Sequence, residues 1–361
     1  MVLRPLAPAT MPTLRFSTIP RPLLVRCLHE HTLLHPRIPV LRTKVRPSLL
    51  LPIAPTPGLE FITEVEPAIR AVADLLKDSG GKVVVLTGAG VSTDSGIPDY
   101  RGEKGAYAVN ANYKPIYFQE FVSIHPFRQR YWARGYLGWS QIQHAHPNAT
   151  HHSLASLHRA GLISHLITQN VDRLHQAAGS LPDHTTELHG TLHEVHCLSC
   201  SHTVSRDEFQ ATLAQMNPDW AQWAAGLEQS GTRPQTNPDG DVELPASISY
   251  AGFAYPSCGS CGTGVMKPSV VFFGENIHPR VKQVSFQAVE RSKAVLVVGS
   301  SLATYSAFRL VKVAKELGKQ VGIVNLGVTR GDSIADFKVD LGCALVFSGV
   351  QRMLDGGVGS S

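Results

Sequence analysis

The sequence contains no run of about 18 consecutive apolar residues, so a membrane-spanning helix is not expected. The body of the chain also lacks an excess of basic residues. Residues 1–59 hold eight Lys or Arg and one acidic residue, so they contribute +7 to the net charge of +5, and the rest of the chain carries −2. This balance argues against nucleic-acid binding, and we expect neither nucleic acid nor a membrane as a partner. A globular protein remains, since 361 residues with 43% apolar side chains can build a large core.

Residues 1–58 almost lack acidic side chains, with Glu30 as the exception, and they are rich in Arg, Ser and Thr. This composition is typical of a mitochondrial transit peptide, which predicts a location in the mitochondrial matrix. The segment contains eleven prolines, which do not suit the amphipathic helix of such a peptide, and a disordered basic tail remains the alternative. A secretory signal is not expected, because no compact apolar stretch with a small-residue cleavage site is present.

The region 83–102 lacks the third glycine of the common dinucleotide-binding pattern, because Thr93 occupies that position. It nonetheless begins with an apolar run, residues 83–86, of the kind that forms a strand buried on both faces of a parallel sheet. Gly88 and Gly90 follow, and a backbone without Cβ atoms can turn tightly and approach a phosphate group. The spacing by itself leaves two interpretations open, a nucleotide-binding loop and a tight structural turn.

Ordered structure is expected from about residue 59, and a helical pattern runs from Phe61 to Gly80. Apolar runs then alternate with helical stretches, and each run ends in glycine or polar residues. This alternation predicts the α/β class, with a doubly wound parallel sheet whose ligand crevice lies at the carboxyl ends of the strands. The runs are residues 83–86, 162–168, 294–298 and 320–324. The aromatic-rich residues 103–150 are expected to form a helical layer beside that crevice, with most of their rings packed in a core. Residues 351–361 are expected to be a flexible tail.

Cysteine is scarce, with six residues, and four of them form two CxxC pairs, Cys197 with Cys200 and Cys258 with Cys261. Such pairs wrap a tetrahedral zinc ion, and four thiolates leave no position for water, so one structural Zn²⁺ ion is expected. Two redox dithiols or disulfides are the alternative, which a reducing matrix disfavours. The surrounding residues 191–268 interrupt the alternation of strands and helices and are predicted to be an inserted zinc-binding module.

Several motifs occur in a fixed order: GAGVSTDSGIPDYRG at 88–102, TQNVDRLH at 168–175, ELHG at 187–190, the two CxxC pairs, and GSS at 299–301. In this set and order the chain resembles the sirtuin family over residues 59–350. Further stretches, MKPSVVFFGENI at 266–277 and NLGVTRGD at 325–332 among them, are similar to the class II, mitochondrial sirtuin-4 type. The resemblance implies a Rossmann-like large domain that binds NAD and a small inserted zinc-binding domain.

The activity implied by this resemblance is that of an NAD-dependent protein-lysine deacylase. Its partners would be acyl-lysine protein substrates, and its products free lysine, nicotinamide and O-acyl-ADP-ribose. By motif, the NAD site would be lined by Gly88, Ala89, Gly90, Ser92, Thr93, Asp99, Tyr100, Arg101, Gln169, Asn170, Val171, Asp172, Gly299, Ser300, Ser301, Asn325, Leu326, Gly327 and Cys343. The strand that pairs with the substrate backbone would comprise Val271, Phe272, Phe273, Gly274 and Glu275.

His189, in the ELHG motif, is implied as the general base that accepts a proton from a ribose hydroxyl. A neutral imidazole suits that role at the pH of the matrix. Asn170 would bind ribose hydroxyls or an ordered water, and Asp172 would bind the nicotinamide carboxamide. Helix capping is an alternative role for Asp172, and burial as a small apolar residue is an alternative for Cys343.

The acyl group, the protein substrates and the oligomeric state are not indicated by the sequence. Tyr100 and the pair Ala303-Thr304 occupy positions that could shape the acyl pocket, so acetyl, longer, branched and lipoyl chains all remain open. Two other functions also remain open. One is protein ADP-ribosyl transfer, which is associated with the sirtuin-4 type and needs the same cleavage of NAD. The other is a catalytically weak zinc-module adaptor that binds partners.

Overall fold

The computed structural model describes residues 61–110, 113–232 and 234–356. The predicted transit peptide at 1–58 and the last residues, 357–361, lie outside these ranges. The chain divides into two units, residues 1–49 and 50–361, and all described residues belong to the second. Within the described ranges, no helix has both the length and the apolar character needed to cross a bilayer.

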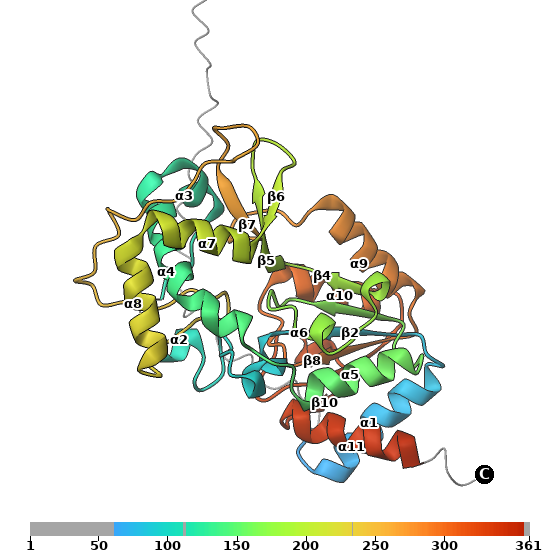
Figure 1. The fold of residues 1–361 in the computed structure, drawn as a ribbon. Coiled ribbons are helices and arrows are strands. Elements are labelled where there is room, and N and C mark those ends of the chain that lie inside the picture. Colours follow the sequence, from blue (N-terminus) through green and yellow to red (C-terminus); the bar gives the residue numbers. More distant parts are fainter. Residues whose placement is uncertain (1–60, 111–112, 233, 357–361) are drawn as a thin grey trace, which may run out of the picture. The chain divides into compact units, whose positions relative to one another are not determined.

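Seven parallel strands form the main sheet in the order β1-β10-β9-β8-β2-β3-β4 (Figure 1). From β2 the chain continues to β3 on one side, and β8 lies on the other side. The order of strands therefore reverses between β2 and β8, where doubly wound sheets bind ligands. The strands are β1 (Phe61–Ile62), β2 (Val83–Thr87), β3 (His165–Thr168), β4 (Thr185–Glu187), β8 (Ala294–Val298), β9 (Gln320–Val324) and β10 (Phe337–Val339).

Helices cover both faces of this sheet because its inner strands are apolar on both faces. Val83 and Val85 of β2 pack in one core with residues of α1, α5 and α11, whereas Val84 and Leu86 pack in another with α9 and α10 (Figure 1). This alternation is the two-residue period of a strand. The helices are α1 (Val65–Asp78), α5 (Ala149–Arg159), α9 (Pro279–Arg291), α10 (Tyr305–Glu316) and α11 (Cys343–Gly356), with the short α6 (Leu174–Ala177) after β3. The predicted doubly wound α/β fold is confirmed.

A three-stranded antiparallel sheet is the centre of a second, smaller domain. In it β5 (Gly190–Cys197) lies between β6 (Thr203–Ser205) and β7 (Met266–Val270). The helices around it are α3 (Phe118–Ser123), α4 (His125–Gln143), α7 (Arg206–Met216) and α8 (Pro218–Gln229), and the short α2 (Ala106–Val109) precedes them in the chain. These strands and helices share one core, which confirms an inserted small module.

The small domain is larger than the sequence predicted, because α3 and α4 belong to it. The ring of Phe272 lies edge-on to Phe121 and Tyr131, with ring centroids 5.2 and 5.1 Å apart. Trp132 packs on Phe209 at 4.5 Å. Aromatic rings are stabilised by removal from water and by such edge contacts. Residues 106–109, 118–123 and 125–143 are helical, as expected, and most of the rings in this region complete the core of the zinc-binding module.

Two boundaries also differ from the prediction. Phe61 and Ile62 do not begin a helix but form β1, because they pair with Lys338 and Val339 of β10. At the other end, α11 continues to Gly356 and includes residues that were predicted to be a flexible tail. It does so because side chains near its end still pack against the core that α11 shares with α1.

Four histidines are buried in the large domain, in α5, β3 and α6: His151, His158, His165 and His175. Burial lowers the pKa of His151 and of His165 to about 4. Burial also lowers the pKa of His158 and of His175. Within the described part of the chain, both ring nitrogens of His158 lack a hydrogen-bond partner. These rings are therefore neutral in the folded protein at neutral pH.

We expect these histidines to make the fold sensitive to acid. Between about pH 6.5 and pH 4 an unfolded chain protonates its histidines while the folded chain does not, so each such group lowers the free energy of unfolding as the pH falls. The loss approaches about 1.4 kcal/mol per pH unit for each proton. Urea unfolding at pH 7.5 and 5.0 checks this. Between these two pH values, His165→Gln should lose less unfolding free energy than the unaltered protein. His146→Gln, an exchange of an exposed histidine, should lose as much as the unaltered protein. Equal losses for both variants would contradict the prediction.

Candidate active site

Two loops at the point of strand reversal interlock through glycines. The N–H of Gly88 donates to Val298 O at 3.1 Å, and that of Gly90 donates to Gly299 O at 2.9 Å. A Cβ atom on Gly90 would lie 2.8 Å from Gly299 O, and one on Gly88 would lie 2.7 Å from the Cβ of Ser300. The glycines are thus required by a protein neighbour, as the tight-turn interpretation predicted, and nucleotide binding by the same loop stays a prediction. That requirement is independent of any phosphate.

The chain after Gly88 forms two 3₁₀ turns, Ala89–Val91 and Thr93–Ser95. Ser92 between them is buried, whereas Thr93 is exposed and donates its hydroxyl to Gly90 O at 3.1 Å. No long helix follows the loop directly, since the next helix is the short α2. The loop therefore offers a nucleotide its main-chain groups rather than the end of a long helix.

A buried polar cluster joins this loop to the end of β3. The side-chain amide of Asn170 donates to Gly88 O at 3.2 Å and to Ser92 Oγ at 3.0 Å. Ser92 Oγ donates to Asp172 Oδ2 at 2.7 Å, and Leu174 N donates to Asp172 Oδ1 at 3.0 Å. Burial raises the pKa of Asp172, and these two hydrogen bonds act against that rise. Asp172 does bond the first residue of α6, as its capping alternative predicted.

Gln169 links the ends of three neighbouring strands. Its side-chain nitrogen donates to Thr87 O at 3.1 Å and to Ser300 Oγ at 2.7 Å. Its side-chain oxygen accepts from Thr304 Oγ1 at 3.0 Å. The two polar groups of this amide are therefore used within the protein, and they fix the loop after β8 against β2 and β3.

His189 lies directly before β5, at the junction of the two domains, and is partly exposed. Its Nδ1 is 3.2 Å from Gln169 O, and its Nε2 is 2.9 Å from Ser306 Oγ. A carbonyl oxygen can only accept, so Nδ1 carries the proton and Nε2 accepts from the Ser306 hydroxyl. Burial lowers the pKa of His189 to about 4, and the bond to Gln169 acts in the opposite direction. The ring is therefore neutral at pH 7 and presents a lone pair at Nε2.

The loop after β9 contains the predicted NAD-site residues Asn325, Leu326 and Gly327. Asn325 N donates to Val339 O at 3.1 Å, and Gly327 N donates to Asp340 Oδ1 at 2.6 Å. The side chain of Leu326 between them is 68% exposed. In the neighbouring loop after β8, Ser301 is fixed through its main chain, because its carbonyl accepts from the backbone of residue 330 at 2.9 Å.

Cys343 begins α11 and is buried, with its Sγ 4.0 Å from Val324 O. Burial raises the pKa of this thiol to about 12. Cys343 belongs to the core between the sheet and α11 and remains a neutral thiol at physiological pH. Its alternative role as a small apolar residue is therefore supported, beside its position near the loop after β9.

The segment from Asp99 to Arg101 is held by contacts with residues that follow it closely in the chain. Asp99 Oδ1 accepts from Gly102 N at 2.7 Å. The guanidinium of Arg101 lies 5.1 Å from the ring of Tyr107, which in turn lies 6.1 Å from the ring of Tyr100. Burial raises the pKa of Tyr100 well above its usual value, so this side chain remains a neutral phenol.

Residues 271–275, which the resemblance implies pair with the substrate backbone, follow β7 directly and end in a turn. Val271 N donates to His189 O at 2.9 Å, which places the start of the segment beside the histidine. Glu275 N then donates to Phe272 O at 3.0 Å, and Gly274 adopts a φ of 79°, so the chain reverses. Only Phe273 pairs as an isolated bridge, with Tyr117. The segment therefore reverses at its end, and its pairing with a substrate backbone stays a prediction.

The four cysteines of the small domain meet as predicted. Their sulfur atoms all lie within 4.8 Å of one another, and the pairs Cys197–Cys261 and Cys200–Cys258 are each separated by 3.7 Å. A tetrahedral zinc ion with bonds of about 2.3 Å requires sulfurs about 3.8 Å apart. A Cβ on Gly264 would lie 2.2 Å from Cys197 Sγ, so the backbone closes around the group. The arrangement fits one zinc ion with no open ligand position.

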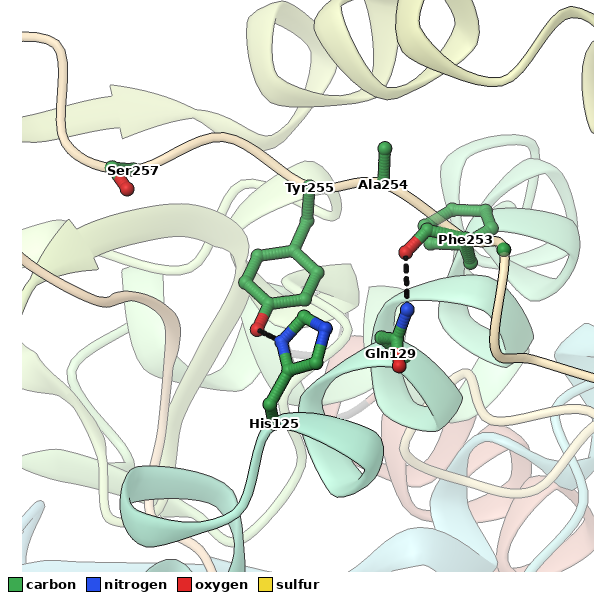
Figure 2. Close-up of a pocket in the computed structure, with 7 residues that line it drawn as sticks. His125, Gln129, Phe253, Ala254, Tyr255 and Ser257 are labelled. Carbon is green, nitrogen blue, oxygen red and sulfur yellow. Dashed lines mark hydrogen bonds between the residues drawn. The ribbon is translucent and has the colours of Figure 1, made fainter.

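A pocket of about 460 Å³ lies elsewhere in the small domain. Figure 2 shows residues that line it. It lies between the start of α4 and residues 252–257, where Gln129 donates to Phe253 O at 3.1 Å and His125 Nδ1 is 2.5 Å from the Tyr255 hydroxyl. None of the predicted site residues lines it. The candidate active site is therefore the set of loops at the carboxyl ends of β2, β3, β8 and β9, together with His189.

Some residues of the site were missed by the sequence reasoning. Ser306 contacts His189, and it lies in the stretch after GSS that carries the resemblance, but no chemical role was assigned to it. His151, with its Nε2 3.5 Å from Ser92 Oγ, completes the buried polar cluster. Its sequence context gives no signal, because only the tertiary structure brings α5 against the loop.

Comparison with known proteins gives one family and a consistent set of relatives. The model of the Sir2 family matches residues 88–306. The protein of Batrachochytrium dendrobatidis named NAD-dependent protein deacylase SIR4 is 47% identical over 78% of this chain and 93% of its own length. The Drosophila melanogaster NAD-dependent protein deacylase Sirt4 is 44% identical over 77% of this chain and 85% of its own.

Solved structures give the same family. A mutant Sir2 homologue in complex with ADP-ribose superposes with a TM-score of 0.60 at 26% identity, over 81% of this chain and 98% of that one. A Sir2 protein with a p53 peptide and NAD⁺ superposes with a TM-score of 0.57 at 30% identity, over 80% and 99%.

We predict that Cys258→Ser loses the metal and lowers the melting temperature, because three thiolates cannot close the site. Zinc per chain by mass spectrometry, together with a thermal scan, measures both effects. Cys343→Ser, which removes a thiol outside this cluster, should keep the zinc. A full zinc content in Cys258→Ser would contradict the metal site.

Proposed function

The chain belongs to the Sir2 family and is an NAD-dependent protein deacylase of the sirtuin-4 type, and we propose that His189 is the general base of its reaction. The observation that carries this proposal is the hydrogen bonding of the two ring nitrogens of His189. Its Nδ1 is held by Gln169 O, and its Nε2 keeps a lone pair that only a hydroxyl contacts. A neutral base positioned in this way can accept a proton from another hydroxyl.

Support also comes from what surrounds His189. Its main-chain oxygen holds Val271, at the start of the segment proposed for the peptide, and its ring contacts the residue next to Asn170, in the loop proposed for the nucleotide. A group between two substrates can act on atoms of both. The acyl-lysine and the ribose would then meet at Nε2.

NAD, when bound, supplies an electrophilic ribose carbon through the departure of nicotinamide. Around it, we assign to Asn170 the contact with ribose hydroxyls, because its amide nitrogen donates to Gly88 and Ser92 and its oxygen remains as an acceptor. Asp172 would hold the carboxamide, and the remaining loop residues named above would line the nucleotide. The Ser306 hydroxyl would give up its bond to His189 as the ribose hydroxyl takes that position.

We further propose that residues 59–350 form the catalytic domain, with the zinc ion in a structural role. The four sulfurs fill a tetrahedral shell and leave no position at which the ion could bind water or substrate. The ion would act by holding β5, which begins directly after His189.

We propose the mitochondrial matrix as the location, on the Arg-rich and acid-poor composition of residues 1–58. A fluorescent protein fused after residues 1–58 should be imported into mitochondria, because the basic segment provides the targeting signal. The same fusion with its Arg residues replaced by Gln should stay outside. Equal distribution of the two fusions would refute the location.

We predict that His189→Ala lowers turnover by about 10²-fold or more, because the proton acceptor is lost. NAD binding should persist, since the loops that would hold it are fixed by other residues. Nicotinamide release with an acyl-peptide measures turnover, and calorimetry measures binding. His146→Ala, an exchange of an exposed histidine, should behave like the unaltered protein. Normal turnover of His189→Ala would remove it as the base.

A screen of acyl-lysine peptides with NAD, read by mass spectrometry, tests the activity itself and finds the preferred acyl group. Deacylation should yield O-acyl-ADP-ribose and a peptide reduced by the acyl mass. A covalent gain of ADP-ribose on protein would instead establish the transferase. Absence of nicotinamide release with every peptide, together with partner binding that survives His189→Ala, would establish the adaptor.

A further inference from the structure

Two lysines in the described part of the chain are almost fully withdrawn from water, and each lies behind one of the two segments proposed to bind a substrate. Lys267 is 1% exposed and Lys338 is 0% exposed. A buried ammonium group is costly unless its N–H groups find acceptors, and an apolar side chain can often fill such a place as well or better. The groups that each ammonium holds therefore indicate why it is there.

Lys267 lies on β7 and holds the segment 271–275. Its Nζ donates to the carbonyl oxygens of Pro268 and Val270, and it forms an ion pair with Glu275 Oε2 at 3.0 Å. The same carboxylate accepts from Phe272 N at 2.8 Å. One ammonium thus joins the end of β7 to the turn that follows it. Burial lowers the pKa of Lys267, and the nearby Glu275 offsets part of this shift.

Lys338 lies on β10 and holds the loop after β9 in the same manner. Its Nζ donates to the carbonyl oxygens of Asn325 and Val339, and it lies 3.6 Å from Asp340 Oδ1. That carboxylate oxygen also accepts from Gly327 N at 2.6 Å. Burial lowers the pKa of Lys338, and the nearby Asp340 offsets part of this shift.

The two sites share one design, in which a buried ammonium contacts two main-chain carbonyls and a carboxylate that itself binds a main-chain N–H of the segment. A ring covers each ammonium, Phe272 at 4.4 Å for Lys267 and Phe61 at 5.2 Å for Lys338. In such water-excluded surroundings these hydrogen bonds are strong and directional. They fix the path of the backbone, which packing alone would not specify.

We propose that Lys267 and Lys338 are positioning residues for two different substrates. Lys267 sets the backbone that pairs with the acyl-peptide, and Lys338 sets the loop that receives the adenosine end of NAD. This inference rests on the proposed function, because it uses the substrate assignments of residues 271–275 and 325–327. Neither lysine touches a substrate, so each acts through the segment that it holds.

The test is a comparison of Lys267→Met and Lys338→Met in the full-length, zinc-loaded protein. Lys267→Met should raise the KM and the Kd of an acyl-peptide by about 10-fold, which is the effect of losing a hydrogen bond to a charged group. Its KM for NAD should change less than about 2-fold. Lys338→Met should show the reverse pattern. Each variant loses the same buried charge, so each is the matched control for the other.

A merely structural role would lower the melting temperature and the active fraction of both variants without separating the two KM values. Lys312→Met, an exchange of an exposed lysine on α10, should change nothing. If a Met variant does not fold, Glu275→Gln and Asp340→Asn weaken the same ion pairs while keeping the shape of the side chains. Each should raise the same KM as the corresponding lysine variant, by a smaller factor.

The outcomes separate this inference from the function on which it rests. Parallel changes of both KM values in both variants, with normal turnover by the unaltered protein, would overturn the positioning roles and leave the deacylase assignment intact. An unaltered protein that binds neither NAD nor any acyl-peptide would overturn the proposed site and this inference together.

Discussion

The close contact between the loops after β2 and β8 is the constraint on which the site depends. At the point where the strand order reverses, Gly90 and Gly299 approach so closely that a Cβ on either would overlap the other loop. The contact fixes both loops before any ligand binds, and Gln169 and Asn170 then attach the end of β3 to them. Loops fixed in this way need less ordering when a ligand binds.

One of the connections between the two domains lies directly at His189. Gly190 directly follows His189, pairs with Val270, and has a φ of 78° with Ser269 O 1.9 Å from the position of a Cβ. The proposed general base therefore lies where the sheet of the small domain begins. The aromatic core around Phe272 and the four thiolates stabilise that sheet, and they thereby fix the position of His189.

Most of the main sheet could be predicted because its signals are local. Runs such as 294–298 and 320–324 coincide with β8 and β9, since strands buried on both faces are apolar throughout. The prediction failed where distant contacts decide. Phe61 forms a strand because β10 lies beside it. The rings of α3 and α4 were expected to pack in a core, but only their contacts with Phe272 and Phe209 show that this core is that of the zinc-binding module.

The sequence by itself determined the α/β fold, the four metal ligands and the loops that carry the site residues, because spacing along the chain encodes all three. Only the tertiary structure decided how those residues are used. The tautomer of His189 depends on Gln169 O and Ser306. Gly90 and Gly299 are required by their contact with each other, in addition to any ligand. The proposed roles of Lys267 and Lys338 follow from their burial. Such facts depend on hydrogen-bond partners that are remote in the chain, and a local pattern cannot specify them.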